Sequence, residues 1–187
     1  MNLSKTYIDL LSKKISKEIG KEYIIREYGI NEEINNKLIE KNYPQDLIEF
    51  LKIKNGDYNP LIGSLDGIIA YNLFSAEEML RFDMEYTYRN IKELYEYDSM
   101  QVDEKIKVEG EHFWIWIGED VVNNGGWSQL YVDMTPSEFG VKGQVVQFVH
   151  DEDRFKVIAN SFNELLENII KSDFNFLDEY IIDYFKR

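Results

Sequence analysis

Residues 112–150 read HFWIWIGEDVVNNGGWSQLYVDMTPSEFGVKGQVVQFVH. Three runs of β-prone residues, 112–117, 127–134 and 144–150, are separated here by turns rich in glycine, asparagine and proline. A fourth run, 155–159, follows after an acidic turn. Connections as short as these favour hairpins, so the pattern predicts an antiparallel sheet.

The first of these runs carries apolar side chains on both faces. In a strand, Trp114 and Trp116 share one face, and the isoleucines beside them share the other with Phe113. Apolar residues on both faces are typical of a central strand that is covered on both sides. Trp127 is different, because it follows the flexible turn 123–126 and precedes polar residues. Core packing and partial exposure are both consistent with its position.

Amphipathic helices flank the strands on both sides in the sequence. Apolar spacing and capping signals predict helices over 3–18, 31–40, 44–54, 75–97 and 161–170, and a last one from about residue 172. A further strand is predicted over 68–73, and residues 98–110 are predicted to form a loop. Pro44 suits a helix start, Gly56 suits a helix end, and Ser161 opens a capping box.

This order of helices, clustered strands and helices predicts an α+β fold in a single domain, with a sheet of about four to six antiparallel strands and flanking helices. We expect residues 1–30 to form an N-terminal helical extension, 31–170 the central domain and 171–187 a C-terminal helix packed on it. The chain has 187 residues, of which 44% are hydrophobic, so it can bury a core.

The charge is strongly acidic and unevenly distributed. There are 21 basic and 35 acidic side chains, which gives a net charge of −14. Residues 1–60 hold ten of each sign, so residues 61–187 carry the whole excess. Such a field repels nucleic acid and anionic membranes and attracts basic partners. Solubility alone is the other explanation for the same composition.

Cysteine is absent, which excludes disulfides and thiolate metal sites. The first 22 residues mix apolar side chains with lysines throughout, so they do not resemble a signal peptide. No stretch approaches the ~20 apolar residues of a membrane span. We therefore expect a cytoplasmic protein that does not enter a membrane.

Few residues carry the chemistry of an enzyme. The two histidines, His112 and His150, are far apart in the sequence, and no thiolate is present to complete a zinc site with either. No nucleophile elbow, Walker loop or dinucleotide fingerprint occurs. We therefore predict no catalytic residue, no metal and no cofactor. Abundant acidic pairs leave a hydrolase that uses two carboxylates as an alternative.

An ordered set of motifs accompanies these patterns. The set comprises YPQDLIEFL (43–51) with Asn55-Gly56, WIWIGED (114–120), LYVDMTP (130–136), GVKGQV (140–145) and ANSF (159–162). In this order the motifs resemble the SUKH superfamily, which includes the fungal Smi/Knr cell-wall-synthesis regulators and many bacterial immunity proteins. The long acidic insertion at 75–110, and Tyr43 in place of the usual leucine, depart from the family pattern.

The resemblance implies a binding scaffold, and its motif residues have mainly structural roles. These residues are Pro44, Gly56, Trp114, Asp133, Pro136, Gly140, Gly143, Ser161 and Phe162. We expect Asp133 to accept backbone N–H bonds in its turn, and Gly140 and Gly143 to take positive φ.

The resemblance also implies a non-enzymatic immunity protein that neutralises a cognate polymorphic toxin, such as a nuclease. Residues 77–138 hold fifteen acidic and five basic side chains, so this part of the chain would attract a basic toxin. The predicted contact residues are Glu119, Asp120, Trp127 and Glu138. The alternatives are a regulatory scaffold like the fungal members, a peptide-binding module without an electrostatic basis, and the hydrolase.

Overall fold

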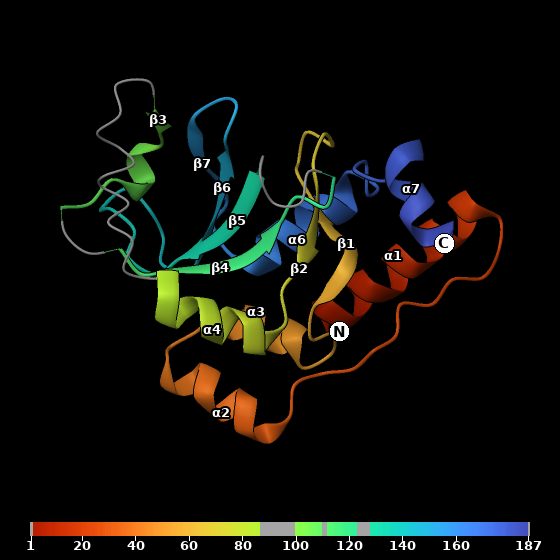
Figure 1. Cartoon of the computed structure of the whole chain (residues 1–187), viewed down its shortest axis with the longest axis horizontal. Helices are drawn as coiled ribbons and strands as arrows, with labels where there is room; N and C mark the ends of the chain where they lie inside the picture. Colours follow the sequence, from red (N-terminus) through yellow and green to blue (C-terminus); the bar gives the residue numbers. More distant parts are fainter. Residues whose placement is uncertain (1, 87–99, 110–111, 123–127, 187) are drawn as a thin grey trace.

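Figure 1 shows the computed structural model of the chain, which describes residues 2–86, 100–109, 112–122 and 128–186. The helices are α1 (Leu3–Ile19), α2 (Glu32–Glu40), α3 (Gln45–Leu51), α4 (Ala76–Tyr86), the 3-10 helix η1 (Glu104–Ile106), α6 (Phe162–Lys171) and α7 (Glu179–Lys186). The strands are β1 (Asp57–Gly63), β2 (Ala70–Leu73), β3 (Gln101–Val102), β4 (Trp114–Glu119), β5 (Ser128–Asp133), β6 (Gln144–Val149) and β7 (Arg154–Ala159). The predicted α+β class is confirmed.

The main sheet has the strand order β3-β7-β6-β5-β4. Strands β4 to β7 pair antiparallel with their sequence neighbours, as the short turns predicted. The two-residue strand β3 runs parallel to β7 at one edge, so the sheet is mixed, and it lies where a loop was predicted. The predicted strand 68–73 is β2, and it pairs with a strand, β1, that the sequence did not predict. Asn59 and Pro60 lie inside β1, and they are residues typical of turns.

The β1–β2 hairpin continues the main sheet beyond β4. The Phe74 amide donates to the Ile117 carbonyl at 2.9 Å, and the Val121 amide donates to the Ala70 carbonyl at 3.0 Å. Tyr71 forms an antiparallel bridge with Asp120. Because β4 therefore has neighbours on both edges, its two apolar faces belong to a strand inside the β structure.

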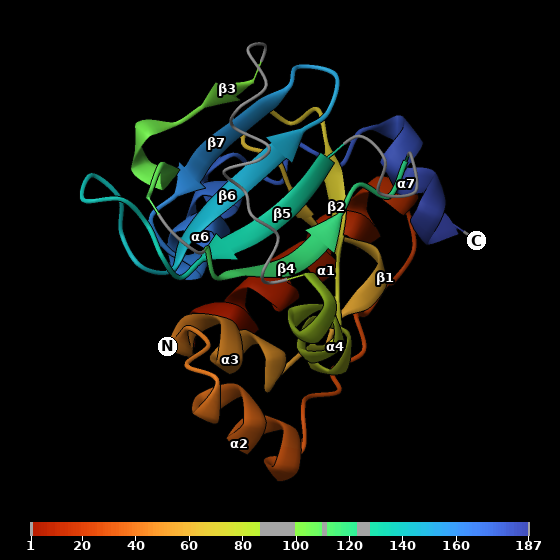
Figure 2. The same ribbon diagram turned by 60° about the vertical axis from the view of Figure 1, so that its left-hand side comes forward.

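The main hydrophobic core lies between one face of the sheet and the helices α1, α3 and α6 (Figure 2). From the sheet it includes Ile115 and Ile117, both fully buried. From α1 it includes Tyr7, Ile8, Leu11 and Ile15, which are at most 1% exposed and follow helical spacing. The segment predicted as an N-terminal extension therefore supplies one wall of the core.

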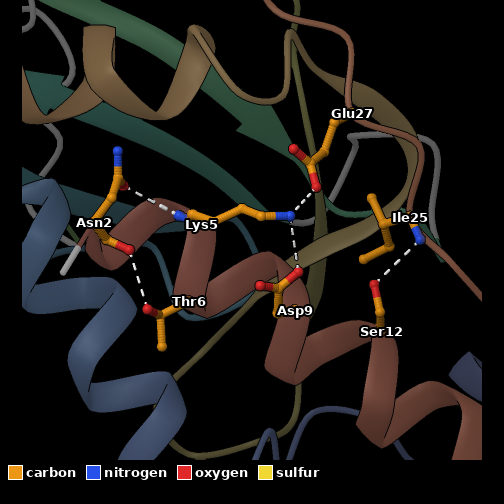
Figure 3. A network of polar contacts seen from close by, with 7 residues as sticks. All are labelled: Asn2, Lys5, Thr6, Asp9, Ser12, Ile25 and Glu27. Carbon is orange, nitrogen blue, oxygen red and sulfur yellow. Dashed lines mark hydrogen bonds and ion pairs between the residues drawn. The ribbon is translucent and has the colours of Figure 1, made fainter.

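A polar network fastens the segment after α1, residues 21–30, back onto that helix (Figure 3). Lys5 binds both Asp9 and Glu27, and the Ser12 hydroxyl accepts the Ile25 amide at 3.1 Å. The Ile25 side chain is 4% exposed and points into the core. This extended segment is thus held by contacts with α1 and not by a helix of its own.

The C-terminal segment returns to the same helix. The Phe174 ring lies 5.4 Å from that of Tyr7, and Lys14 forms an ion pair with Asp173 at 2.7 Å. The last helix was predicted from residue 172, but α7 begins only at Glu179. Asp173 and Phe174 have φ angles of 54° and 55°, which interrupt helical geometry at that point. Among the described residues, no helix is both long and apolar enough to cross a membrane.

Candidate protein-binding surface

The face of the sheet opposite α1 and α6, here called the outer face, carries a second and smaller core. Trp114, Val146 and Phe155 of the sheet form it with Ile106 of η1, and each is at most 5% exposed. Strand alternation places Trp114 in this second core and Ile115 and Ile117 in the main core, as predicted. Trp116 pairs with Tyr131 on the face of Trp114, but its ring also packs against the main core through Phe74 and Phe82, with centroids 5.1 and 4.9 Å away.

Beside this small core lies an aromatic row, formed by Trp116, Tyr131 and Phe148, whose rings are partly exposed. The Trp116 and Tyr131 rings stack with centroids 6.3 Å apart, and Phe148 stacks on Phe155 at 4.5 Å. The Trp116 indole N–H donates to the Gly118 carbonyl at 3.0 Å. These contacts fix the rings, so a partner that binds them pays little side-chain entropy.

Glu119 borders the aromatic row at the end of β4, where it pairs with Gln129. Partial burial raises the pKa of the Glu119 carboxyl, and the nearby carboxylates Glu78 and Asp120 raise it further. Glu78 is fixed at the start of α4, where it accepts hydrogen bonds from the amide and hydroxyl of Ser75 at 2.8 and 2.9 Å. The charge of Glu78, which this cap fixes in place, thus acts on Glu119 at the edge of the aromatic row.

Three of the four predicted contact residues lie in the described part of the chain, and these three are not brought together. Asp120 is only 3% exposed, and its carboxylate accepts the Val122 amide at 2.8 Å on the opposite side of β4 from Glu119. Glu138 is exposed, but it follows the far end of β5 from the end that pairs with Glu119. Trp127 lies outside the described residues. Of the three that the structure describes, Glu119 alone lies beside the aromatic row.

The motif residues at that far end of β5 form a buried polar junction. The Asp133 carboxylate, 0% exposed, accepts the Thr135 amide and the Gln144 side-chain amide, both at 2.9 Å. The same Gln144 nitrogen donates to the Lys105 carbonyl at 3.0 Å. Burial raises the pKa of Asp133 to about 6. The turn bond predicted for Asp133 is present, and Gln144 extends it to the segment before β4.

The glycines of these motifs serve two different purposes. Gly56 and Gly143 have φ angles of 74° and 90°, the conformation that favours glycine. Gly140 is not among the residues with positive φ, contrary to expectation. A Cβ atom there would lie 2.3 Å from the Lys105 carbonyl oxygen, so close approach and not backbone angle explains the glycine.

The remaining motif residues support helix ends and the core. Pro44 is the residue before α3, and a Cβ atom on Gly143 would lie 3.8 Å from its ring. The Ser161 hydroxyl accepts the Glu164 amide at 3.1 Å, which completes the predicted cap of α6. Phe162 is fully buried, while Pro136 packs near Gly140 in the turn after β5. These contacts give the motifs a structural role.

Sequence reasoning missed a buried polar network between the hairpin and the sheet. The Tyr71 hydroxyl lies 2.6 Å from the Ser128 hydroxyl and accepts the Gln147 amide at 2.6 Å. Burial raises the pKa of Tyr71. The signal was available, because Ser128 and Gln147 are polar residues at strand positions whose alternation points into the main core.

The described residues contain no cluster of three or more histidine or acidic side chains that could hold a metal ion. No curated protein sequence matches the chain. The family model of the SMI1/KNR4 family (SUKH-1) matches residues 32–168, most of the chain, from α2 through most of α6 and including all the motifs described above. The chain therefore belongs to the SMI1/KNR4 family (SUKH-1).

Proposed function

We propose that this protein is a non-enzymatic, cytoplasmic immunity protein that binds and neutralises a cognate polymorphic toxin with a basic surface. The observation that carries the proposal is the aromatic row of Trp116, Tyr131 and Phe148 bordered by Glu119. Ordered aromatic side chains at an acidic edge combine the two features of a protein-binding hot spot for a basic partner.

The overall charge of the chain also favours a basic partner. A net charge of −14 attracts a basic toxin from a distance and repels nucleic acid and anionic membranes. A nuclease must hold phosphate groups, so its active cleft is basic, and an acidic surface placed over that cleft would exclude the substrate. In this mechanism charge sets the association rate and the aromatic row sets the dissociation rate.

A hydrolase is the alternative that one observation favours, because Glu119 and Glu78 lie close together and the pKa of Glu119 is raised. Glu78, however, is committed to capping α4 through two hydrogen bonds from Ser75. A regulatory scaffold like the fungal members of the superfamily would use the same surface to bind a different protein. Only the identity of the partner therefore distinguishes a regulatory scaffold from an immunity protein.

The test is to co-express the chain with the toxin-like protein encoded beside it, and to measure rescue of growth and a co-purifying complex. Stopped-flow association at increasing salt then tests the electrostatic mechanism. We expect rescue and an association rate that falls with salt. A complex whose association rate is indifferent to salt would overturn the acidic mechanism, and absence of both complex and rescue would overturn the immunity function.

A further inference from the structure

A groove lies between the C-terminal end of α1 and helix α7, away from the aromatic row. Its volume is about 690 Å³. Glu18 lines one side, and the segment from Leu177 to Lys186 lines the other. Leu177 and Ile182, which are 9% and 5% exposed, supply its apolar lining. A volume of this size accommodates several side chains of a bound segment.

The walls of the groove are held in place by contacts between the two ends of the chain. Lys14 of α1 binds both Glu18 at 3.4 Å and Asp173 at 2.7 Å. The ring of Phe185 on α7 packs edge-on against that of Tyr23, with centroids 5.3 Å apart. Because these contacts are already made, the groove is preorganised for an incoming segment.

The groove is rimmed by exposed charge of mostly one sign. Four carboxylates, those of Glu18, Asp178, Glu179 and Asp183, face one ammonium group, that of Lys186. Lys186 is paired with Asp183 at 2.8 Å and Lys14 with Glu18 at 3.4 Å, so two of the four acids are compensated and Asp178 and Glu179 are not paired with a basic side chain of the described residues. These two carboxylates leave an excess of negative charge beside the buried leucine and isoleucine side chains. This chemistry fits a segment that presents lysine or arginine on both sides of an apolar residue.

We propose that the α1–α7 groove is a second docking surface, which receives a basic segment with an apolar side chain from the partner protein. The inference rests on the proposed function for the identity of that partner, a basic toxin. Both walls lie outside the residues 32–168 that match the family, so the groove is formed by segments that flank the shared domain. It would add specificity for one toxin to a scaffold that the family has in common.

The probe is a fluorescein-labelled peptide of alternating lysine and leucine, with binding measured by fluorescence anisotropy at low salt. The variant carries Asp178→Asn with Glu179→Gln, because asparagine can keep the helix cap that Asp178 makes to the Ile181 amide at 2.8 Å. We expect affinity about fivefold lower than that of the unmodified protein, from the loss of two rim charges. Lys186→Gln releases Asp183 and should raise affinity instead.

The matched control carries Glu40→Gln with Asp151→Asn, which removes the same charge from α2 and from the β6–β7 turn. It should leave the affinity unchanged. Equal weakening by the control would show that overall charge holds the peptide, and it would overturn the groove. Equal binding of a lysine–serine peptide would overturn it as well, because the apolar lining would then have no role.

The same variants in the toxin complex separate this inference from the proposed function. Faster toxin dissociation from the Asp178→Asn, Glu179→Gln protein than from the control supports the groove. Identical dissociation rates for the variant and the control would overturn the proposed docking at the groove, and the immunity function would still stand. Failure of the unmodified protein to bind any toxin overturns the immunity function, whereas the peptide measurement still decides whether the groove receives basic segments.

Discussion

Replacing Asp133 by asparagine should change the pH dependence of stability more than it changes stability at pH 7. Asp133 is completely buried, and no lysine or arginine in the described part of the chain lowers its pKa. Burial raises its pKa from 3.8 to about 6, against the opposing effect of its hydrogen bonds from Gln144 and Thr135. The Trp114 indole N–H also opposes this rise in the pKa of Asp133, although it makes no hydrogen bond with a described residue.

The sign follows from proton binding. Between pH 4 and pH 6 the folded protein holds a proton on Asp133 that the unfolded chain has released, so stability is lost as pH rises through about 6. At roughly 1.4 kcal/mol per pKa unit, the ionised carboxylate costs about 3 kcal/mol at pH 7 and about half of that at pH 5.

Asparagine removes this charge penalty but creates a conflict of donors. Its amide nitrogen would face the Gln144 amide nitrogen, which cannot turn away without losing its bond to the Lys105 carbonyl at 3.0 Å. That conflict costs about 1–3 kcal/mol, similar to the penalty removed at pH 7. We therefore expect Asp133→Asn to be nearly neutral at pH 7.

The free energy of unfolding should be measured by urea titration at pH 7, 6 and 5 for both proteins. Because the other carboxylates are common to both, their difference isolates Asp133. As the pH falls from 7 to 5, we expect the free energy of unfolding of the unmodified protein to rise by about 1–1.5 kcal/mol relative to that of the variant. A difference that stays constant with pH, or that moves the other way, would refute a raised pKa at Asp133.

Three further substitutions test other contacts. Gly140→Ala should destabilise the protein by about 2 kcal/mol, because the new Cβ meets the Lys105 carbonyl; urea unfolding measures this cost. Tyr71→Phe removes a buried hydroxyl that bonds two side chains, and its thermal unfolding should report a loss of about 2 kcal/mol. Glu119→Gln should slow association with the proposed toxin about twofold at low salt, whereas Glu138→Gln, with the same charge change, should slow it less. Equal effects of the two would place the contact elsewhere.

Local sequence patterns were sufficient to predict much of this fold. The alternation in β4 correctly placed Trp114 and the two isoleucines Ile115 and Ile117 in different cores, because a strand has only two faces. The same rule also separates Glu119 from Asp120, since successive residues of an extended chain point to opposite faces, and applying it would have predicted that they do not form one acidic patch. Glu138 is a different case, because its distance from Glu119 depends on the length of β5 and on the pairing of whole strands.

Long-range packing supplied what those patterns could not. The stripe of Tyr7, Leu11 and Ile15 predicted an amphipathic helix, but the sequence does not indicate which surface that stripe covers. The reason for Gly140 was equally hidden, since the carbonyl that excludes a side chain belongs to Lys105, far from it in sequence. Asp133 and Gln144 lie eleven residues apart, and only the pairing of β5 with β6 brings them together.

The region that matches the family and the segments on either side of it therefore pack into one core. The matched region ends at residue 168, within α6, yet that helix packs against α1, which lies wholly outside the match. Tyr7 joins the two parts directly, because its hydroxyl donates to the Leu61 carbonyl of β1 at 2.6 Å while its ring contacts Phe174. A substitution that shifts α1 at the α1–α7 groove can therefore also shift the β1–β2 hairpin, which extends the sheet beside β4. Substitutions on the exposed rim can change partner recognition without touching the core, whereas changes in the apolar lining act on both.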